Sequence, residues 1–269
     1  MATKGTARDD GGNRLLVLDK ISRILDAFTL DEPELTLQQI GSKAGLAAST
    51  TQRLVQNLTR ERYLHREGNM YSVGVRVLRW ASAGTAALDI TERIRPALRD
   101  LRDQTGETAC FYVRDGLWRV VVAVAHTRHV VIRPFAVGQV MPVYAGAAAR
   151  VFVAHDEELR LELKDADLAR YTDATPTSLD VLLADVDRVK DLGYASAFSE
   201  RHEGVGSISS PVFGFDGGLV GVLGIGFPNE RVGPNNVDEL GPLVARAATA
   251  ASSALGYRAQ NTELNDALD

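Results

Sequence analysis

Residues 36–64, TLQQIGSKAGLAASTTQRLVQNLTRERYL, have the pattern of two short amphipathic helices around a glycine-centred turn. Leu37, Ile40 and Ala44 recur at helical spacing, which predicts one buried stripe on the first helix. Gly45 follows directly, at a position where left-handed backbone ends a helix at little energetic cost. The pattern predicts a helix-turn-helix.

The ends of the first helix and the inner face of the second support this prediction. Thr36 suits the N-cap, and Gln39 stands three residues later, where a capping box requires Glu or Gln. On the second helix Leu54 and Leu58 face inward at helical spacing. Thr51 can either pack inward against the first helix or face outward, and the sequence leaves both possibilities open.

The outward face of the second helix is polar and basic. Ser, Thr, Gln and Arg side chains can pair with base edges and phosphate oxygens, with Gln suited to adenine and Arg to guanine. This helix therefore fits the major groove of DNA. An alternative is an amphipathic hairpin that serves packing only. The outward residues are Ala48, Ser49, Gln52, Arg53, Gln56 and Arg60.

A further helix and a hairpin frame the pair. Residues 18–28 have one apolar face at helical spacing. In residues 63–73 apolar side chains alternate on both sides of a Glu-Gly-Asn turn, which is typical of a short hairpin. Three helices followed by a hairpin make a winged helix-turn-helix domain, which we assign to residues 15–74.

Charge is distributed unevenly along the chain. The net charge of the chain is −5. Positions 1–83 contain 12 basic and 9 acidic residues, whereas the remainder contains 18 basic and 26 acidic residues. Such a local positive excess is typical of phosphate binding, whereas the acidic remainder argues against non-specific DNA binding by the second half. Between positions 43 and 79 only Glu61 and Glu67 oppose seven basic residues: Lys43, Arg53, Arg60, Arg62, Arg66, Arg76 and Arg79.

The 269 residues allow two domains with separate cores. No apolar run approaches the roughly 18 residues of a membrane span, and residues 1–14 are polar, which predicts a disordered tail without a secretory signal. The lone Cys110 allows no internal disulfide. These features predict a cytoplasmic protein with no membrane partner.

The second half alternates hairpins with helices, which predicts an α+β sandwich with a mainly antiparallel sheet. A linker helix is expected over residues 75–91, the sandwich over 92–258 and a tail over 259–269. The expected strands are 108–113, 118–125, 130–135, 195–199, 207–213 and 219–226. The expected helices are 94–104, 145–154, 156–163, 179–192 and 237–257.

Several stretches of both halves, in order and spacing, resemble the IclR family of bacterial transcriptional regulators, in which a winged helix is joined to a GAF-like effector-binding domain. Each stretch is weakly specific alone, and together they span roughly residues 15–255. They are Gly45-Leu46, Ser49-Thr50, Arg53-Leu54, Tyr71-Ser72-Val73-Gly74, Gly138 to Pro142, Ala145 to Ala154, Leu192-Gly193-Tyr194-Ala195, Glu200 to Val205, and Ile208-Ser209-Ser210-Pro211-Val212.

The resemblance implies operator binding by dimers or pairs of dimers. It also implies a response to small organic molecules, commonly carboxylic or aromatic acids, and no cofactor. Arg66 in the wing should reach the DNA backbone or minor groove. By similarity, the contacts from the recognition helix come from Ser49, Thr50, Gln52, Arg53 and Gln56, with Thr51 and Arg60 as further candidates.

The resemblance also places an effector pocket between the sheet and the N-terminus of the helix that begins near Ala147. Free backbone N–H groups and the helix dipole there suit an anion or a carbonyl oxygen. Many relatives have Ala-Gly-Lys at the start of this helix, whereas here Ala149-Arg150 replaces Gly-Lys, and we expect Arg150 to point outward.

Small side chains replace polar ones at other expected pocket positions. Ala197 stands where relatives can carry a polar or acidic contact, Ser207 where they can carry Cys, and Gly224 and Gly226 where they can carry Ser. Alternation puts both glycines on one strand face, where a ligand could approach the backbone. We expect a wider, less polar pocket for an aromatic or otherwise bulky organic acid or amide. The glycines could equally serve sheet packing alone. The candidate residues are Ala147, Ala148, Ala197, Ser207, Ser209, Gly224 and Gly226.

Two other functions compete with a ligand-responsive regulator, for which repression of a catabolic operon is the favoured form. An enzyme would find its best metal-binding material in His126 and His129, but no Cys or carboxylate accompanies this pair, and we predict neither metal nor catalysis. Ser207, Ser209 and Ser210 lack the strained turn of a hydrolase nucleophile. A ligand sensor that acts through protein partners is the second competitor.

Overall fold

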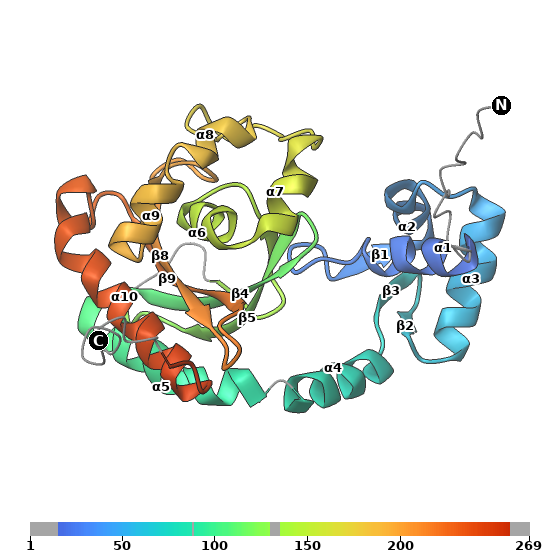
Figure 1. Ribbon diagram of the computed structural model, residues 1–269. Coiled ribbons are helices and arrows are strands. Elements are labelled where there is room, and N and C mark those ends of the chain that lie inside the picture. The colour runs from blue at the N-terminus through green and yellow to red at the C-terminus, as the bar shows by residue number, and fades with distance from the viewer. Residues whose placement is uncertain (1–15, 88, 130–134, 259–269) are drawn as a thin grey trace, which may run out of the picture. The chain divides into compact units, whose positions relative to one another are not determined.

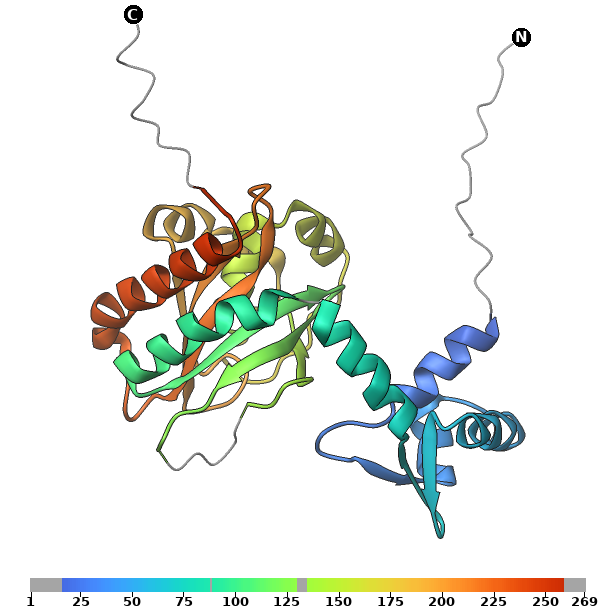
Figure 2. The same cartoon turned by 90° about the horizontal axis from the view of Figure 1, so that it is seen from below.

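The computed structural model describes residues 16–87, 89–129 and 135–258. It divides into two compact units, Met1–Leu88 and Asp89–Asp269 (Figures 1 and 2). The two tails expected at residues 1–14 and 259–269 lie outside the described residues.

Up to residue 74 the first unit contains three described helices and a small antiparallel sheet in the order β1-β3-β2 (Figure 1). Ile24, Ile40, Val55 and Leu64 are fully or almost fully buried and hold the helices to the sheet. The elements are α1 Leu16–Leu25, β1 Glu34–Thr36, α2 Leu37–Ala44, α3 Ala48–Arg60, β2 Leu64–Glu67 and β3 Met70–Val73. The predicted winged helix-turn-helix is therefore confirmed.

Local signals position this motif as the sequence predicted. The Thr36 side chain accepts a hydrogen bond from the Gln39 backbone N–H at 3.3 Å, and the Gln39 side chain accepts from the Thr36 N–H at 2.8 Å. Gly45 ends α2 with φ 61° in the left-handed region. Strand β1, which pairs with β3 through Leu35 and Tyr71, was not predicted because three residues carry too little periodicity.

Two helices cover the stretch in which a linker helix was expected. Helix α4 spans Val75–Ala87, and α5 spans Asp89–Thr105, so the predicted helix at 94–104 is the second part of α5. Ile94, Leu98 and Leu101 of α5 are buried in the core of the second unit.

The second unit is built on one six-stranded sheet in the order β6-β5-β4-β9-β8-β7, and all its pairs are antiparallel. Because neighbouring strands run in opposite directions, hairpins join β4 to β5 and β8 to β9. The strands are β4 Thr108–Asp115, β5 Trp118–Ala125, β6 Val140–Pro142, β7 Ala195–Phe198, β8 Val205–Phe213 and β9 Leu219–Pro228.

Helices cover both faces of this sheet (Figures 1 and 2). On one face α5 and α10 lie side by side over a core that contains Phe111 and Phe227. On the other face α6 lies across β8 and β9, and α7, α8 and α9 pack around it. The bounds are α6 Ala147–His155, α7 Glu157–Lys164, α8 Leu179–Leu183, α9 Val186–Leu192, a short 3-10 turn Pro234–Asn236 and α10 Val237–Ala254. The predicted α+β class is confirmed.

Two predicted elements differ from the structure. The single helix expected at 179–192 is broken between α8 and α9, where the Asp185 carboxylate accepts a hydrogen bond from Arg150 of α6 at 2.6 Å. The strand expected at 130–135 falls almost wholly on residues outside the described ranges. Strand β6 was not predicted, and it pairs with β5 through Met141 and Arg119.

Candidate functional site

One face of α3 presents polar and basic side chains to solvent. Its apolar face, with Leu54, Val55 and Leu58, is buried against the rest of the first unit, so the opposite face is fixed outward. Gln52, one turn from Gln56, lies on this outward face with Arg53. The predicted contacts that are exposed are Ser49, Gln52, Arg53, Gln56 and Arg60, and Thr50 is half-buried.

Thr51 does not belong to this surface. It is 1 % exposed, and its hydroxyl donates to the Ala47 carbonyl at 3.1 Å. A Cβ added at Gly41 of α2 would lie 3.1 Å from the Thr51 hydroxyl, so the two helices touch here. The alternative of base contact by Thr51 is wrong, because the side chain is part of the α2–α3 packing.

The wing places a second basic side chain on the exposed surface. Arg66 of β2 donates through Nε to the Gly68 carbonyl at 2.9 Å, and its guanidinium lies 5.5 Å from the centre of the Tyr71 ring. A cation held over an aromatic face loses little freedom when it meets a phosphate. Its geometry is compatible with the predicted DNA contact.

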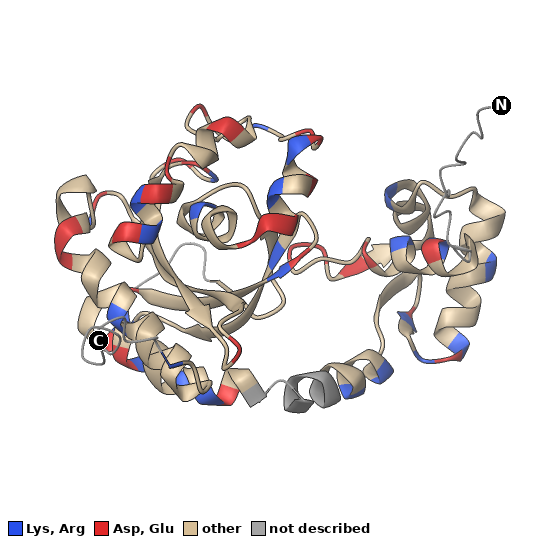
Figure 3. Ribbon diagram, viewed as in Figure 1, with Lys and Arg blue, Asp and Glu red and all other residues tan. Residues whose placement is uncertain are grey.

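Ion pairs neutralise part of the basic excess in this unit. Lys43 pairs with Glu32 at 2.6 Å, and Arg76 pairs with Glu61 at 3.0 Å and stacks over Tyr63. Among the described residues, no carboxylate is paired with the exposed arginines of α3. In Figure 3 the ribbon is blue, the colour of Lys and Arg, at positions on α2, on α3 and in the wing.

In the second unit the predicted effector residues that belong to strands lie on one face of the sheet. Ala197 pairs with Ser207, which in turn pairs with Gly226, so the three form one row across β7, β8 and β9. The next row joins Ser209 to Gly224. Since Ala147 N–H donates to the Ser207 hydroxyl at 3.1 Å, this face is the one beneath the N-terminus of α6. Ala148 is buried in the same core.

Two N–H groups at that helix end, those of Gly146 and Ala147, already have internal partners. Gly146, with φ 92°, donates its N–H to the Glu200 carboxylate at 2.7 Å, across a separation of 54 residues. The expected free donors are thus occupied by Glu200 and by Ser207. An anion bound at this helix end would therefore share it with the Glu200 carboxylate, and the expected effector pocket between the sheet and α6 stays a prediction.

Arg150 does not point outward as expected. Its side chain is 14 % exposed, and it pairs with Asp185 at 2.6 Å and with Glu200 at 2.7 Å. The arginine therefore balances the carboxylate that caps α6. No local sequence signal links these residues, since each comes from a different element.

The two glycines of β9 that were predicted to line the effector pocket, Gly224 and Gly226, have different surroundings. A Cβ at Gly224 would overlap the Ser209 hydroxyl and lie 2.5 Å from the Ile208 carbonyl oxygen, so glycine here permits close packing of β8. A Cβ at Gly226 would lie 2.6 Å from the ring of Phe135. The space that the sequence assigned to a wide pocket beside Gly226 is occupied by an aromatic side chain of the protein itself.

Sequence reasoning missed a buried cation near this site. Arg119 of β5 is 5 % exposed, and its Nη1 donates to the Pro142 carbonyl at 2.7 Å. Burial lowers the pKa of Arg119 to about 10, and the nearby Arg201 cation acts in the same direction, while the Tyr112 and Glu200 charges oppose it. Burial also raises the pKa of Cys110 to about 12. A lone arginine in the strand WRVVVAVA was the available signal.

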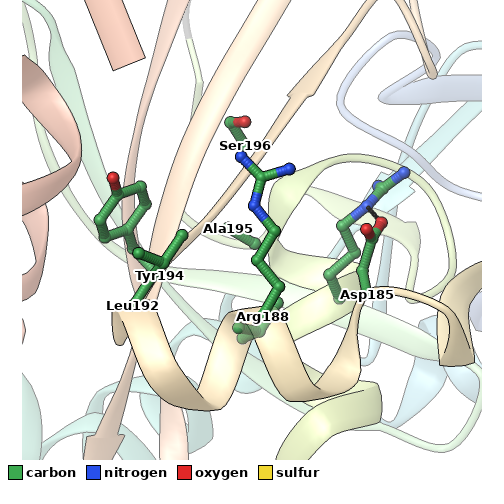
Figure 4. Close-up of a pocket in the computed structure, with 8 residues that line it drawn as sticks. Asp185, Arg188, Leu192, Tyr194, Ala195 and Ser196 are labelled. Atoms are coloured by element: carbon green, nitrogen blue, oxygen red, sulfur yellow. Dashed lines mark hydrogen bonds and ion pairs between the residues drawn. The ribbon is translucent and has the colours of Figure 1, made fainter. Parts of the chain in front are cut away.

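A small cavity lies elsewhere, between α6, α9 and β7 (Figure 4). Its volume is about 110 Å³, and Arg150, Asp185, Arg188 and Tyr194 are among its lining residues. An engineered dry cavity of roughly 150 Å³ binds benzene. The cavity here is smaller than that, and it shares no residue with the predicted effector site.

No helix in the described ranges could cross a membrane. In the same part of the chain, no group of three or more His, Cys, Asp or Glu side chains is arranged to hold a metal ion.

Comparison with known families agrees with both units. Residues 17–68 match the IclR helix-turn-helix domain, and residues 83–253 match the family model described as bacterial transcriptional regulator IclR C-terminal. The chain belongs to the IclR family. It is a transcriptional regulator of that family, whose named relatives are regulators and not enzymes.

Relatives align along nearly the whole chain. The HTH-type transcriptional regulator XynR of Escherichia coli is 25% identical over 246 residues, covering 90% of this chain and 98% of its own. BhcR of Paracoccus denitrificans is 28% identical over 256 residues, which cover 94% of this chain and 91% of BhcR. A solved IclR homologue from Microbacterium hydrocarbonoxydans, complexed with 4-hydroxybenzoate, has a TM-score of 0.76 at 22% identity and covers 89% of this chain and 98% of its own.

Proposed function

We propose that this protein is a ligand-responsive repressor of a catabolic operon, which binds operator DNA through α3 and the wing. The observation that carries the DNA contact is the outward face of α3, where Gln52, Arg53 and Gln56 are exposed while the opposite face is buried. Amide and guanidinium groups on one helix face are the groups that read adenine and guanine in the major groove. A protein that binds operator DNA in a bacterium would be located in the cytoplasm.

We further propose that the effector is an aromatic or otherwise bulky organic molecule bound in the second unit. Support comes from the small residues Ala197 and Gly226, which share the α6 face of the sheet. The Phe135 ring lies against Gly226, so a bulky ligand would displace that ring. A structural neighbour was solved with 4-hydroxybenzoate, so an aromatic acid is compatible with this fold.

The coupling between the two units is proposed to act through oligomers. In a dimer, or a pair of dimers, two recognition helices would read the half-sites of an inverted repeat, and their spacing would depend on the chain segment 74–91. An effector would then change the population of arrangements that match the operator, which requires a different affinity for each arrangement. Ligand would cause release if it favoured the non-matching arrangement.

Fluorescence anisotropy with DNA from upstream of the protein's own gene tests the proposal. We expect binding whose affinity falls steeply as salt rises, because phosphate contacts release counterions. Effector should then reduce that affinity in the same assay. Absence of salt-dependent binding to any upstream fragment would favour the alternative of a sensor that acts through protein partners.

A further inference from the structure

Arg119 is a buried cation whose hydrogen-bonding capacity is only partly used. Its Nη1 donates to Pro142, but Nε is buried and has no hydrogen-bond partner within the described residues. Its pKa of about 10 leaves the guanidinium charged at neutral pH. A buried donor without a partner destabilises a fold, and it does so more strongly when the donor belongs to a charged group. A bound acceptor at Nε would remove this cost.

No carboxylate of the described chain serves as that partner. Glu200 lies near enough to influence Arg119, but its two oxygens are engaged by Arg150 and by the Gly146 N–H. The centre of the Tyr112 ring lies 5.5 Å from the guanidinium carbon. Arg201 adds a second positive charge to the surroundings.

The Nη2 atom of the same guanidinium lies close to the N-terminus of α6. A Cβ added at Gly146, the N-cap of this nine-residue helix, would lie 3.3 Å from Arg119 Nη2 and 3.6 Å from the Ser207 hydroxyl. A cation, a hydroxyl and the positive end of a helix dipole thus lie close together, beside the Glu200 carboxylate that accepts the Gly146 N–H. Together they can recognise a planar, negatively charged group, to which an arginine donates two parallel hydrogen bonds.

We propose that Arg119 is the counter-ion of an effector carboxylate that binds between β5 and the N-terminus of α6. This inference rests on the proposed function and narrows it, since it selects organic acids over the corresponding amides. Ser207, which already accepts from Ala147, can donate its hydroxyl proton to the same carboxylate.

The remainder of the ligand would extend along the sheet toward Gly226. Ser207 and Gly226 are paired across β8 and β9, and the ring of Phe135 lies against the glycine. An aromatic acid anchored at Arg119 would place its ring in this region and exchange places with the Phe135 side chain. The site thus accounts for both an acidic and an aromatic part of one molecule.

Isothermal titration calorimetry on the full chain tests the charge requirement without DNA. The probes are matched pairs: benzoate and benzamide, 4-hydroxybenzoate and 4-hydroxybenzamide, phenylacetate and phenylacetamide. For the native protein we expect at least one acid to bind roughly 10- to 100-fold more tightly than its amide, the range of a charge-assisted hydrogen bond. Amides that bind as tightly as the acids, or a panel in which no acid binds, would overturn the proposal.

Variants then assign the preference to Arg119. Arg119→Gln should abolish the difference between acid and amide, and Arg119→Lys should retain part of it because the charge remains. Arg99→Gln, at an exposed arginine of α5, is the matched control and should keep the full difference. Retention of the acid preference by Arg119→Gln contradicts the assignment. If Arg119→Gln does not fold, the acid preference of Arg119→Lys, compared with that of the native protein, tests the assignment instead.

The anisotropy assay keeps this inference separate from the proposed function. A native protein that prefers acids in calorimetry but does not bind upstream DNA would refute the regulator proposal and leave the Arg119 site standing. Operator binding that responds equally to amides and acids would support the regulator proposal and refute the assignment of Arg119 as the counter-ion.

Discussion

The recognition face of α3 and the site beneath α6 use similar polar groups in opposite environments. On α3, Arg53 and Gln56 are exposed, and their side chains can contact a partner without any change in packing. Beneath α6, Arg119 and Glu200 are each 5 % exposed, and their positions depend on residues from several elements. Removal of a polar group should therefore have different consequences in the two regions. On the recognition face of α3 it should lower only the affinity for DNA, whereas beneath α6 it should change both the affinity for effector and the stability of the fold.

The largest effect is expected inside the second unit, for Gly224→Val. The new side chain would collide with the Ser209 hydroxyl and the Ile208 backbone, so the free energy of unfolding should fall by about 1–3 kcal/mol or more. Thermal or urea unfolding measures it. Gly233→Val is the control, because nothing lies within 4 Å of an added Cβ there and φ is −98°. Equal stability of the two variants would contradict the close packing of β8 and β9.

On the recognition face, Arg53→Ala should weaken operator binding by about 1–3 kcal/mol if the guanidinium reads a base. The melting temperature should stay unchanged, because the side chain is exposed and lies on the face away from the core. Anisotropy and thermal unfolding measure the two quantities. Arg99→Ala removes the same charge from the second unit and should leave operator affinity near the native value.

Thr51→Val sharpens the comparison within α3 itself. The substitution removes the hydroxyl that bonds to the Ala47 carbonyl and keeps the shape of the side chain, so stability should fall by about 0.5–1.5 kcal/mol. Operator affinity should hardly change, whereas the neighbouring Gln52→Ala should reduce it. A reduction for Thr51→Val as large as that for Gln52→Ala would mean that Thr51 does reach the DNA.

The smallest effect concerns pH. Burial, reinforced by the Lys190 and Arg160 cations, lowers the pKa of His155 at the end of α6 below its usual 6.5. The unfolded chain therefore binds the proton more readily, so stability should fall as the pH drops through the unfolded pKa and continue to fall until the folded pKa is reached. Urea unfolding between pH 8 and pH 5 measures this, and His155→Gln should reduce the slope. An unchanged slope would assign the dependence to other groups.

Sequence alone determined the elements whose signals are local. Thr36, Gln39 and Gly45 set the ends of α2 within a few residues, and helical spacing at Leu54 and Leu58 fixed which face of α3 is exposed. Alternation likewise revealed β4, β5, β8 and β9, and the antiparallel α+β class followed from their hairpins. Such signals act between near neighbours along the chain, so they can be read without knowledge of the tertiary structure.

Only the tertiary structure decided the chemistry beneath α6. Glu200 meets Gly146 across 54 residues, Arg150 turns inward to meet it, and Phe135 occupies the space beside Gly226. Whether Arg119 is paired depends on which elements surround it, and spacing along the chain carries no information about that. The physical reason is that burial and charge pairing are properties of the packed interior, where residues distant in sequence set the field that each group experiences.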